Sequence, residues 1–396
     1  MSGTFAQIGA VTALNLRTLP ERWQTAAVTV VGIAGVMLVI VGVFSIYEGF
    51  RKTLQLSASE DVAMILRGGS SDELSSGLEI EAARVVSDAP GVARDAAGPL
   101  VSTELYVSAD IKNRATGSSS FVPIRGVTEQ SPKLRRAFRI VEGRYFTSGS
   151  TEVIVGRRAS TQYVGLGLGA VLELGPNRWQ IVGIFDDDGS VSESEIWADL
   201  RAVQDAYDRG ATFQSIRARL ASPAAFRQFK DALTSDPRVN LRIQTEREFY
   251  EHLSSALRTI VLVGGVTVGL LMGIGAIFGA LNTMYAAVAA RTREIATLRA
   301  MGFGALPVTV SVLAEALLLG ATGAVIGALI AYLAFNGLQT STLNFVSFTA
   351  VTFAFTVTLP LTVGALLYAL ALSLVGGLLP AWRAARLPIT TGLREL

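Results

Sequence analysis

Three long stretches of the chain are apolar and carry no charged side chain, and polar segments separate them. They cover residues 25–47, 259–290 and 316–382. A helix rises about 1.5 Å per residue, so about 20 apolar residues cross the roughly 30 Å hydrocarbon core of a bilayer. The last stretch is long enough for two crossings, and polar residues at 336–344 divide it. The pattern predicts four transmembrane helices, at 25–47, 259–290, 307–335 and 358–380.

The segment between the first two spans, residues 48–258, is polar and has the size of a soluble domain. Helical spacing predicts helices at 79–89 and 223–234. Strand-like runs, punctuated by Gly and Pro, lie at 100–108, 121–127, 152–155, 170–174 and 179–185. Grouped strands and helices indicate an α+β domain. The predicted fold class is an α-helical membrane protein with four transmembrane helices and a large α+β extracytoplasmic domain between helices 1 and 2.

Residues 345–358 fit two structures. Phe, Val and Thr alternate there as in a strand, and the same composition suits an apolar helix at the outer interface. We assign the segment to the extracytoplasmic connection, residues 336–357.

The composition supports a membrane protein with a soluble insert. Hydrophobic residues make up 50% of the chain and charged residues 17%, with a mean hydropathy of +0.45, whereas soluble domains carry about 25% charge. Residues 48–288 hold 26 of the 34 Lys and Arg and 28 of the 32 Asp and Glu. The net charge of +2 comes without a basic run, so nucleic-acid binding has no electrostatic basis. The chain has no cysteine, which excludes disulfides, thiolate metal sites and a Cys nucleophile.

Basic residues in the short loops predict the orientation of the chain. They precede the first span, lie between the second and third, and follow the fourth, whereas the loop between the third and fourth has no charge. Both termini and the 289–306 loop are therefore expected in the cytoplasm, and residues 48–258 outside. The basic residues are Arg17, Arg22, Arg291, Arg293, Arg299, Arg383, Arg386 and Arg394.

The polar residues of the insert predict neither a catalytic site nor a metal site. The Asp-Asp-Asp-Gly turn at 186–189 has Trp197 where a calcium loop needs its twelfth-position Glu, so we interpret it as an acidic surface turn. The single histidine, His252, is expected to have a structural or interfacial role. Glu193 and Glu195 are interpreted as a solvated face rather than as acid–base partners.

A short amphipathic helix is predicted between the second and third spans. Ile295, Leu298 and Met301 fall at i, i+3 and i+6 and form one apolar stripe. Gly302 suits the position after the last helical turn. The polar remainder consists of Arg291, Arg293, Glu294 and Arg299. Such a helix can place its apolar side chains in a groove of a partner protein. The alternative is a surface helix that only joins two spans.

Several sequence stretches resemble a known family. RTREIATLRAMGF (291–303), LAEALLLGATGAVIGALIAY (313–332) and PAWRAARLPITTGLREL (380–396) resemble the permease domain of the MacB/FtsX family, the membrane subunits of type VII ABC transporters. The segments SDAPGVA (87–93), VEGRYF (141–146), EVIVGRRAS (152–160) and QIVGIF (180–185) look like the periplasmic core domain of that family. The layout of one span, a large external domain and three further spans is also similar.

The resemblance implies partners and a mechanism. Residues 291–306 would be the coupling helix that docks on a cytoplasmic ABC ATPase dimer. Two identical or related permeases would pair through spans one and two, and ATP would drive motion of the external domains, a process called mechanotransmission. A periplasmic adaptor or an outer-membrane component, and membrane lipid, are further partners that the resemblance allows.

The source of energy is expected to be a separate polypeptide. None of the four lysines, Lys52, Lys112, Lys133 and Lys230, follows a glycine, so the chain has no Walker A motif. We therefore expect no enzyme activity and no cofactor in this chain, with ATP and Mg²⁺ bound by the partner ATPase.

Two features of the spans have alternative interpretations. Gly265, Gly269 and Gly273 recur every four residues and predict a dimer face, with packing inside one protomer as the alternative. Glu315 lies at the inner start of span three and is expected to bond the 289–306 loop or Arg299, rather than to handle protons or substrate.

The two ends of the chain are assigned to the inner surface. Residues 1–24 form a weakly amphipathic segment. Pro380 is expected to break span four, and the tail at 381–396 carries Arg383 and Arg386 for contact with the ATPase or anionic lipid.

Three functions are considered for a multi-pass protein of a bacterial cytoplasmic membrane. The first is export or extraction of an amphiphile, such as a lipoprotein, lipid, peptide or drug, and the large external domain favours it. The second is an FtsX-like signal transmitter that controls an envelope enzyme such as a cell-wall hydrolase. The third is a membrane-anchored enzyme, and the missing catalytic residues argue against it.

Overall fold

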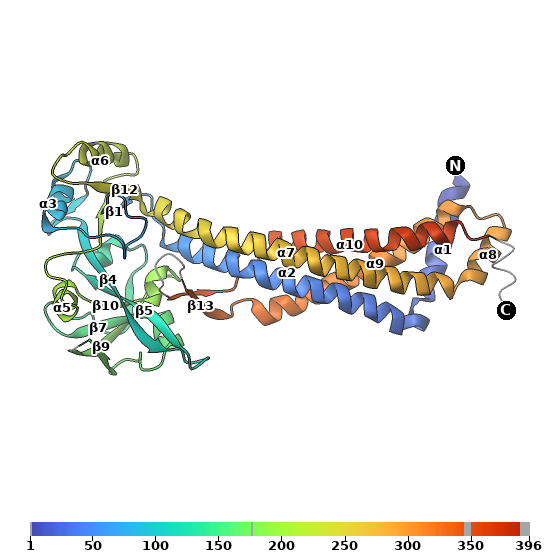
Figure 1. The fold of residues 1–396 in the computed structure, drawn as a ribbon, viewed down its shortest axis with the longest axis horizontal. Coiled ribbons are helices and arrows are strands. Elements are labelled where there is room, and N and C mark those ends of the chain that lie inside the picture. Colours follow the sequence, from blue (N-terminus) through green and yellow to red (C-terminus); the bar gives the residue numbers. More distant parts are fainter. Residues whose placement is uncertain (1, 176, 344–349, 389–396) are drawn as a thin grey trace. The chain divides into compact units, whose positions relative to one another are not determined.

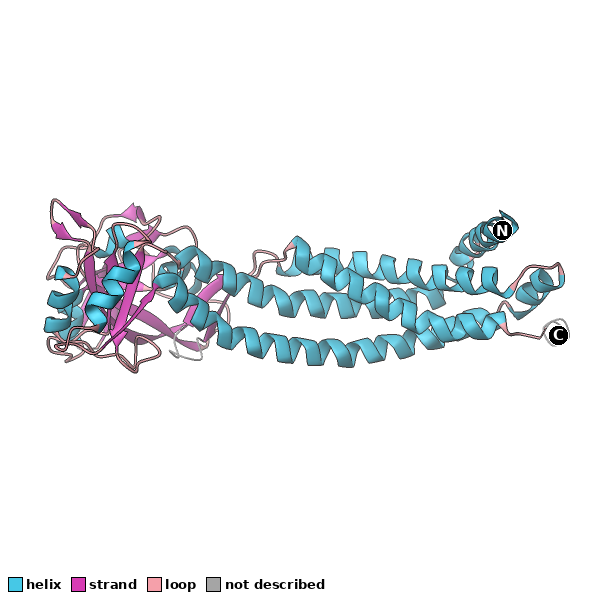
Figure 2. Cartoon of the chain, turned by 90° about the horizontal axis from the view of Figure 1, so that it is seen from above, coloured by secondary structure: helices cyan, strands magenta, loops and turns pink. Residues whose placement is uncertain are grey.

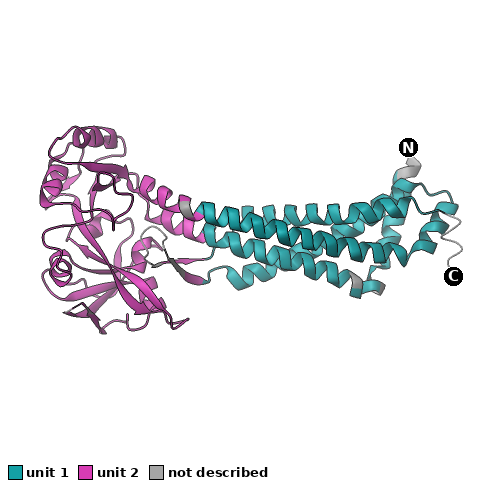
Figure 3. Ribbon diagram, in the orientation of Figure 1, with its two compact units in different colours: residues 1–48, 258–338, 355–396 teal, residues 49–257, 339–354 magenta. Residues whose placement is uncertain are grey.

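The computed structural model describes residues 2–175, 177–343 and 350–388. The chain divides into two compact units, which Figure 3 shows in different colours. The first unit holds residues 1–48, 258–338 and 355–396, and the second holds residues 49–257 and 339–354. Strands belong to the second unit, while the first is helical (Figure 2).

The helical unit is built from the apolar stretches of the sequence. Four helices of the described chain are long and apolar enough to cross a membrane, which confirms the predicted number of spans. Two of them extend past their predicted spans, because α2 continues to Ser57 and α7 begins at Glu246. The helices (Figure 1) are α1 (Ser2–Arg17), α2 (Trp23–Ser57), α7 (Glu246–Ala289), α8 (Thr292–Ala300), α9 (Ala305–Phe335) and α10 (Leu359–Ala385), with a 3-10 turn η1 (Leu19–Arg22).

Glycines allow α9 to approach α2 closely. A Cβ atom on Gly323 or Gly327 of α9 would lie 2.6 or 2.5 Å from a backbone carbonyl oxygen of α2. Only glycine allows two backbones to approach this closely, which is how small residues stabilise helix pairs in a membrane. The contact therefore fixes α9 on α2.

The glycine row of α7 packs inside the chain. Gly265 lies against Phe44 of α2, Gly269 accepts a hydrogen bond of 2.8 Å from the Tyr368 hydroxyl of α10, and all three glycines are buried. A Cβ atom on Gly273 would lie 2.2 Å from the same hydroxyl. Within this chain the row therefore shows the alternative packing inside one protomer, and the dimer face stays a prediction.

Pro380 does not end the fourth span. It lies inside α10, which continues to Ala385. A proline removes one backbone donor, and membrane helices tolerate this when neighbouring helices pack around it. Pro380 is buried, as are Ala381 and Ala384 in the next turn, so packing maintains the helix through the proline.

The second unit contains a ten-stranded sheet of order β12-β1-β11-β4-β5-β10-β7-β9-β6, with β8 added on β9. The pairs β5–β10 and β7–β9 are parallel, and the others are antiparallel. The strands are β1 (Val62–Arg67), β4 (Val101–Lys112), β5 (Ser119–Val127), β6 (Arg139–Gly143), β7 (Glu152–Gly156), β8 (Val171–Leu174), β9 (Asn177–Asp186), β10 (Ile196–Asp199), β11 (Ser215–Arg219) and β12 (Leu241–Thr245).

Two hydrophobic cores divide this unit into lobes. The first lobe holds β1, β11 and β12 under α3 (Ile80–Asp88) and α6 (Ala225–Thr234). The second holds the strands from β5 to β10 with α4 (Arg157–Gln162) and α5 (Leu200–Ala206). Strand β4 belongs to both, since residues 101–104 pair with β11 and residues 105–112 with β5. Shorter elements are β2 (Arg94–Asp95), β3 (Gly98–Pro99), η2 (Ser131–Leu134) and η3 (Val191–Ser194).

The connection between α9 and α10 forms a hairpin of β13 (Gln339–Leu343) and β14 (Ala350–Ala354). The strand interpretation is confirmed for residues 350–354 of the ambiguous segment. Residues 344–349 lie outside the described residues.

A buried network of charges joins the two lobes. Arg125 on β5 makes ion pairs of 2.7 Å with Glu73, 2.9 Å with Glu104 and 2.7 Å with Glu195. Glu104 on β4 also accepts from Arg135 and Arg217, each at 3.0 Å. Arg217 on β11 in turn pairs with Glu246, the first residue of α7. The network thus reaches from α7 and the first lobe to β5 and β10 in the second.

The ion pairs outweigh the cost of burying these carboxylates. Burial alone raises the pKa of Glu104, but Arg135, Arg217 and Arg125 overcome this effect and lower the pKa to about 2. For Glu73, burial likewise raises the pKa, and the charge and hydrogen bonds of Arg125 together with the charge of Arg217 leave it below its usual value.

Two acidic features of the sequence are buried rather than solvated. Glu195 pairs with Arg125, and Glu193 accepts hydrogen bonds from the backbone N–H groups of residues 187 and 189, at 2.9 and 2.7 Å. The prediction of a solvated face at these glutamates is wrong, because buried partners satisfy both. In the 186–189 turn only Asp188 is exposed, while Asp186 and Asp187 are buried.

Candidate functional site

The predicted amphipathic helix exists as α8, and its end follows from one glycine. Gly302 has a φ of +94°, a left-handed conformation that glycine adopts without strain. The N–H groups of Gly302 and Phe303 donate to the carbonyl oxygens of Arg299 and Leu298, both at 3.1 Å. This pair of hydrogen bonds is the Schellman motif, and it confirms the predicted cap.

The apolar stripe of α8 does not face one environment. Ile295 is buried among Met284 and Val288 of α7 and Val308 of α9, Leu298 is half-buried, and Met301 is 64% exposed. Burial of Ile295 holds α8 on its own chain, so this residue is not available to a partner. The surface that α8 presents to solvent instead contains Arg293, Glu294 and Met301.

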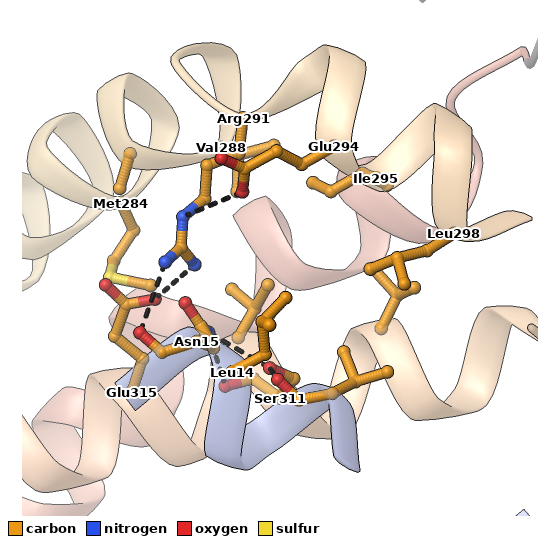
Figure 4. Close-up of a pocket in the computed structure, with 14 residues that line it drawn as sticks. Leu14, Asn15, Met284, Val288, Arg291, Glu294, Ile295, Leu298, Ser311 and Glu315 are labelled. Carbon is orange, nitrogen blue, oxygen red and sulfur yellow. Dashed lines mark hydrogen bonds and ion pairs between the residues drawn. The ribbon is translucent and has the colours of Figure 1, made fainter. Parts of the chain in front are cut away.

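Arg291, the residue before α8, fixes the start of the helix (Figure 4). Its guanidinium lies 3.4 Å from Glu315 of α9, donates to the carbonyl oxygen of Asn15 at 3.2 Å and bonds the Thr18 hydroxyl. Burial lowers the pKa of Arg291, and the negative charge of Glu315 opposes this shift. The guanidinium keeps its charge, because arginine is not deprotonated in proteins. A single side chain thereby joins α8, α9 and the end of α1.

Glu315 bonds the 289–306 loop, one of the two partners expected for it, and does not bond Arg299. Its side chain is buried, and it pairs with Arg291 of the 289–306 loop and, at 3.8 Å, with Arg22. Arg299 instead donates to the carbonyl oxygen of Leu387.

The contact between α1 and α9 was not predicted from the sequence. Asn15 donates from Nδ2 to the Ser311 hydroxyl at 3.0 Å and to its carbonyl oxygen at 3.2 Å. Ser311 in turn donates to the carbonyl oxygen of Val11. Both side chains are buried. The sequence gives little signal for this pair, because both helices contain other polar residues and only the fold shows which of them are buried. A buried polar group needs a partner, since leaving it unpaired is costly.

The basic residues at the end of α10 lie on aromatic rings. The Arg383 guanidinium is 5.6 Å from the ring of Tyr285, and that of Arg386 is 4.2 Å from the ring of Trp382. These contacts stabilise the end of α10. Residues 389–396 of the predicted tail, Arg394 among them, lie outside the described residues.

This arrangement is suited to contact and positioning rather than to catalysis. The buried polar residues hold α8 by its first turn, while its exposed charges remain available for a protein partner. Within residues 2–175, 177–343 and 350–388, no group of three or more His, Cys, Asp or Glu side chains could hold a metal ion.

Comparisons with known families and a curated protein agree with this architecture. Residues 26–236 match the MacB-like periplasmic core domain, and residues 266–389 match the FtsX-like permease C-terminal. The chain is 30% identical over 282 residues to the pyoverdine export ATP-binding/permease protein PvdT of Pseudomonas entomophila. The alignment covers 63% of this chain and 39% of that protein, so the chain spans about two fifths of the length of this relative.

Two solved structures are similar to the external domain. The periplasmic region of MacB from Actinobacillus actinomycetemcomitans has 14% sequence identity and a TM-score of 0.38, covering 50% of this chain and 95% of its own. The extracellular domain of the noncanonic ABC-type transporter YknZ from Gram-positive bacteria has 12% identity and a TM-score of 0.33, covering 46% and 100%.

Proposed function

The chain belongs to the MacB/FtsX family of ABC transporter permeases, and on this premise we propose that it transmits the work of a separate cytoplasmic ATPase to its external domain. Continuous helix is the observation that carries the proposal. Helix α7 runs without interruption over 44 residues, from the end of β12 to a point three residues before α8. At about 1.5 Å per residue this is a rod of about 66 Å. A displacement of α8 would therefore pass through the turn at 290–291 into one continuous helix that leads to β12.

We place α8 and both termini in the cytoplasm, and residues 48–258 outside. The contact with the ATPase dimer would be made by the exposed residues Arg293, Glu294 and Met301, since Ile295 is buried in its own chain. Arg291 would keep α8 in place under load through Glu315 and α1. A second permease, identical or related, would complete the transporter.

We propose export or extraction of an amphiphile as the work done. An apolar hollow of about 330 Å³ lies between α2, α7 and α10, lined by residues such as Phe44, Val266 and Leu361. The Tyr368 hydroxyl in its wall is already bonded to Gly269. Such a lining suits an alkyl or other apolar group. The similarity to a protein named for pyoverdine export also supports export.

The test introduces negative charge on the exposed face of α8. With the chain and its ATPase reconstituted in proteoliposomes, Arg293→Glu and Met301→Asp should reduce permease-dependent ATP hydrolysis at least tenfold, without loss of inserted protein. Arg17→Glu is the matched control, because Arg17 is an exposed arginine at the end of α1. Equal rates for Arg293→Glu and Arg17→Glu would refute the assigned contact.

Co-purification separates export from signalling. An adaptor or a lipid-carrying protein bound to the complex would support export. A cell-wall hydrolase bound to the external domain would instead support the signal-transmitter function.

A further inference from the structure

Three segments that are distant in the sequence meet at Arg158, all within the second unit. Arg158 lies on the short helix α4, and its side chain is 15% exposed. The Nη1 group donates to the Thr53 hydroxyl at the end of α2, at 3.3 Å, and to the carbonyl oxygen of Thr352 on β14, at 3.1 Å. The Nε group lies 3.4 Å from the Glu193 carboxylate on η3. One guanidinium thus joins α2, η3 and β14.

Further contacts hold β14 at the same place. The backbone N–H of Thr352 donates to the Ser194 hydroxyl at 3.1 Å, and the Thr352 hydroxyl bonds the side chain of Gln162 on α4. Both Ser194 and Thr352 are fully buried. If β14 separated from the rest of the domain, the polar groups that now bond Thr352 would lose their partners, which costs free energy.

The end of α2 packs on β14 as well. The rings of Phe50 and Phe353 meet edge to face, with centroids 5.7 Å apart. Gly49 allows this approach, because a Cβ atom there would lie 2.1 Å from the carbonyl oxygen of Ala354. The hairpin and the end of α2 therefore form one packed layer within the second unit, and Figure 3 colours both with that unit.

The hairpin lies between two membrane helices in the sequence, α9 before it and α10 after it. Helix α9 ends at Phe335, four residues before β13, and α10 begins at Leu359, five residues after β14. The two arms remain paired next to the hairpin, because Gly337 donates to the carbonyl oxygen of Phe355 at 2.9 Å. The helices α9 and α10 are thus joined to the hairpin by connections of three and four residues, which are hydrogen-bonded to each other.

We propose that Arg158 is a positioning residue that clasps β14 to the external domain and so gives ATP-driven motion a second route, through α9 and α10, beside α2 and α7. The clasp stays closed throughout the cycle. The inference depends on the proposed transmission of motion, and goes beyond it by assigning the α9–α10 hairpin a part in that transmission.

Arg157 supplies a matched control for Arg158. It is the preceding residue on the same helix and carries the same charge, but its side chain is 51% exposed and pairs with Asp186 at 3.3 Å. Replacing it removes one of the two ion pairs of the buried Asp186, which keeps Arg139 as a partner, and leaves α2, η3 and β14 joined. Both Arg158→Gln and Arg157→Gln remove one positive charge, but only Arg158→Gln removes the contacts that join α2, η3 and β14.

The experiment uses the full complex with its ATPase in nanodiscs, and measures amide hydrogen exchange with and without trapped ATP. In the wild type, ATP should change exchange both in β14 and in the α4–η3 region. In Arg158→Gln, the change in α4–η3 should fall at least twofold while that in β14 persists. Arg157→Gln should match the wild type. If Arg158→Gln also matches it, the clasp is refuted. If even the wild type shows no ATP-dependent change in the external domain, the proposed function itself fails.

A disulfide tests the closed clasp without removing its arginine. The native chain has no cysteine, so Ser194→Cys combined with Thr352→Cys introduces one defined pair. Oxidation should leave ATP hydrolysis within twofold of the reduced protein, and in the Arg158→Gln background it should restore the ATP-dependent exchange in α4–η3. Loss of hydrolysis on oxidation, reversed by dithiothreitol, would show that β14 must detach during the cycle and would overturn the proposal.

Discussion

Removing Arg125 should destabilise the external domain more than any surface substitution. Its side chain is 3% exposed and donates five hydrogen bonds of 2.7 to 3.1 Å, shared among Glu73, Glu104 and Glu195. In Arg125→Met the methionine fills similar space but leaves these carboxylates with too few cations. Breaking one buried ion pair by removing a partner costs about 3–5 kcal/mol.

The expected loss is large enough to measure by thermal unfolding. For a domain of 150–250 residues, 1 kcal/mol shifts the Tm by about 2–4 °C, so Arg125→Met should lower the Tm by about 6–20 °C. Tryptophan fluorescence of the full chain in nanodiscs reports this transition, because Trp179 and Trp197 are buried in the domain. The Trp197 indole N–H donates to Glu195 at 2.8 Å, so one reporter lies inside the network.

Two comparisons make the measurement decisive. Arg178→Met removes an arginine whose pair with Glu173 is 79% and 75% exposed, so its Tm should change by less than about 2 °C. The deficit of Arg125→Met should also shrink between pH 7 and pH 5. Without Arg125, burial raises the pKa of Glu73, and a carboxyl with a raised folded-state pKa gains stability as the pH falls. A Tm within 2 °C of the wild type, or a deficit independent of pH, would show that the network is not a stabilising core.

Three further outcomes are expected. The pKa of Glu104 is lowered to about 2 from its usual 4.5, so its ionised form contributes about 3 kcal/mol to the free energy of unfolding. This contribution is present above pH 4.5 and is lost as the pH falls toward 2. Acid denaturation of the wild type compared with Glu104→Gln should show this loss. Gly327→Val should separate α9 from α2, whose carbonyl oxygen would lie 2.5 Å from the new Cβ, and lower stability in detergent by about 1–3 kcal/mol, whereas Gly275→Val meets open space and should not. In intact cells an impermeant maleimide should label Arg178→Cys and spare Arg293→Cys, and the opposite pattern would reverse the proposed orientation.

The sequence predicted the elements whose signal is local. Uncharged stretches mark the spans, and the alternating strands β4, β5 and β9 and the helix α3 lie close to their predicted residues. Strands β1 and β10 were missed because both of their faces are buried, as residues 62–66 of β1 show, so their sequences do not alternate. Period alone does not identify such a strand.

The contacts of charged residues could not be predicted in the same way. Glu195 looks like a surface residue in sequence, and only the fold brings Arg125, which is 70 residues away, to it. Asn15 and Ser311 are 296 residues apart. For α8, the stripe at 295, 298 and 301 predicted the helix correctly. It could not predict that Ile295 packs on α7 and α9, because an apolar face can pack on its own chain as well as on another protein.

The connectivity of the external domain explains why a charge network stands at its centre. Helix α2 leads after four residues into β1, and β12 leads directly into α7, and these two strands are hydrogen-bonded neighbours at one edge of the sheet. Any shear between α2 and α7 is therefore applied first to the first lobe. The second lobe receives it through β4 and through the chain of ion pairs from Glu246 to Arg217, Glu104 and Arg125. Ion pairs with fixed hydrogen-bond directions resist sliding, whereas hydrophobic contacts are non-directional. In the proposed mechanism, the network therefore lies where a domain that is moved from one edge would transfer that motion to its other half.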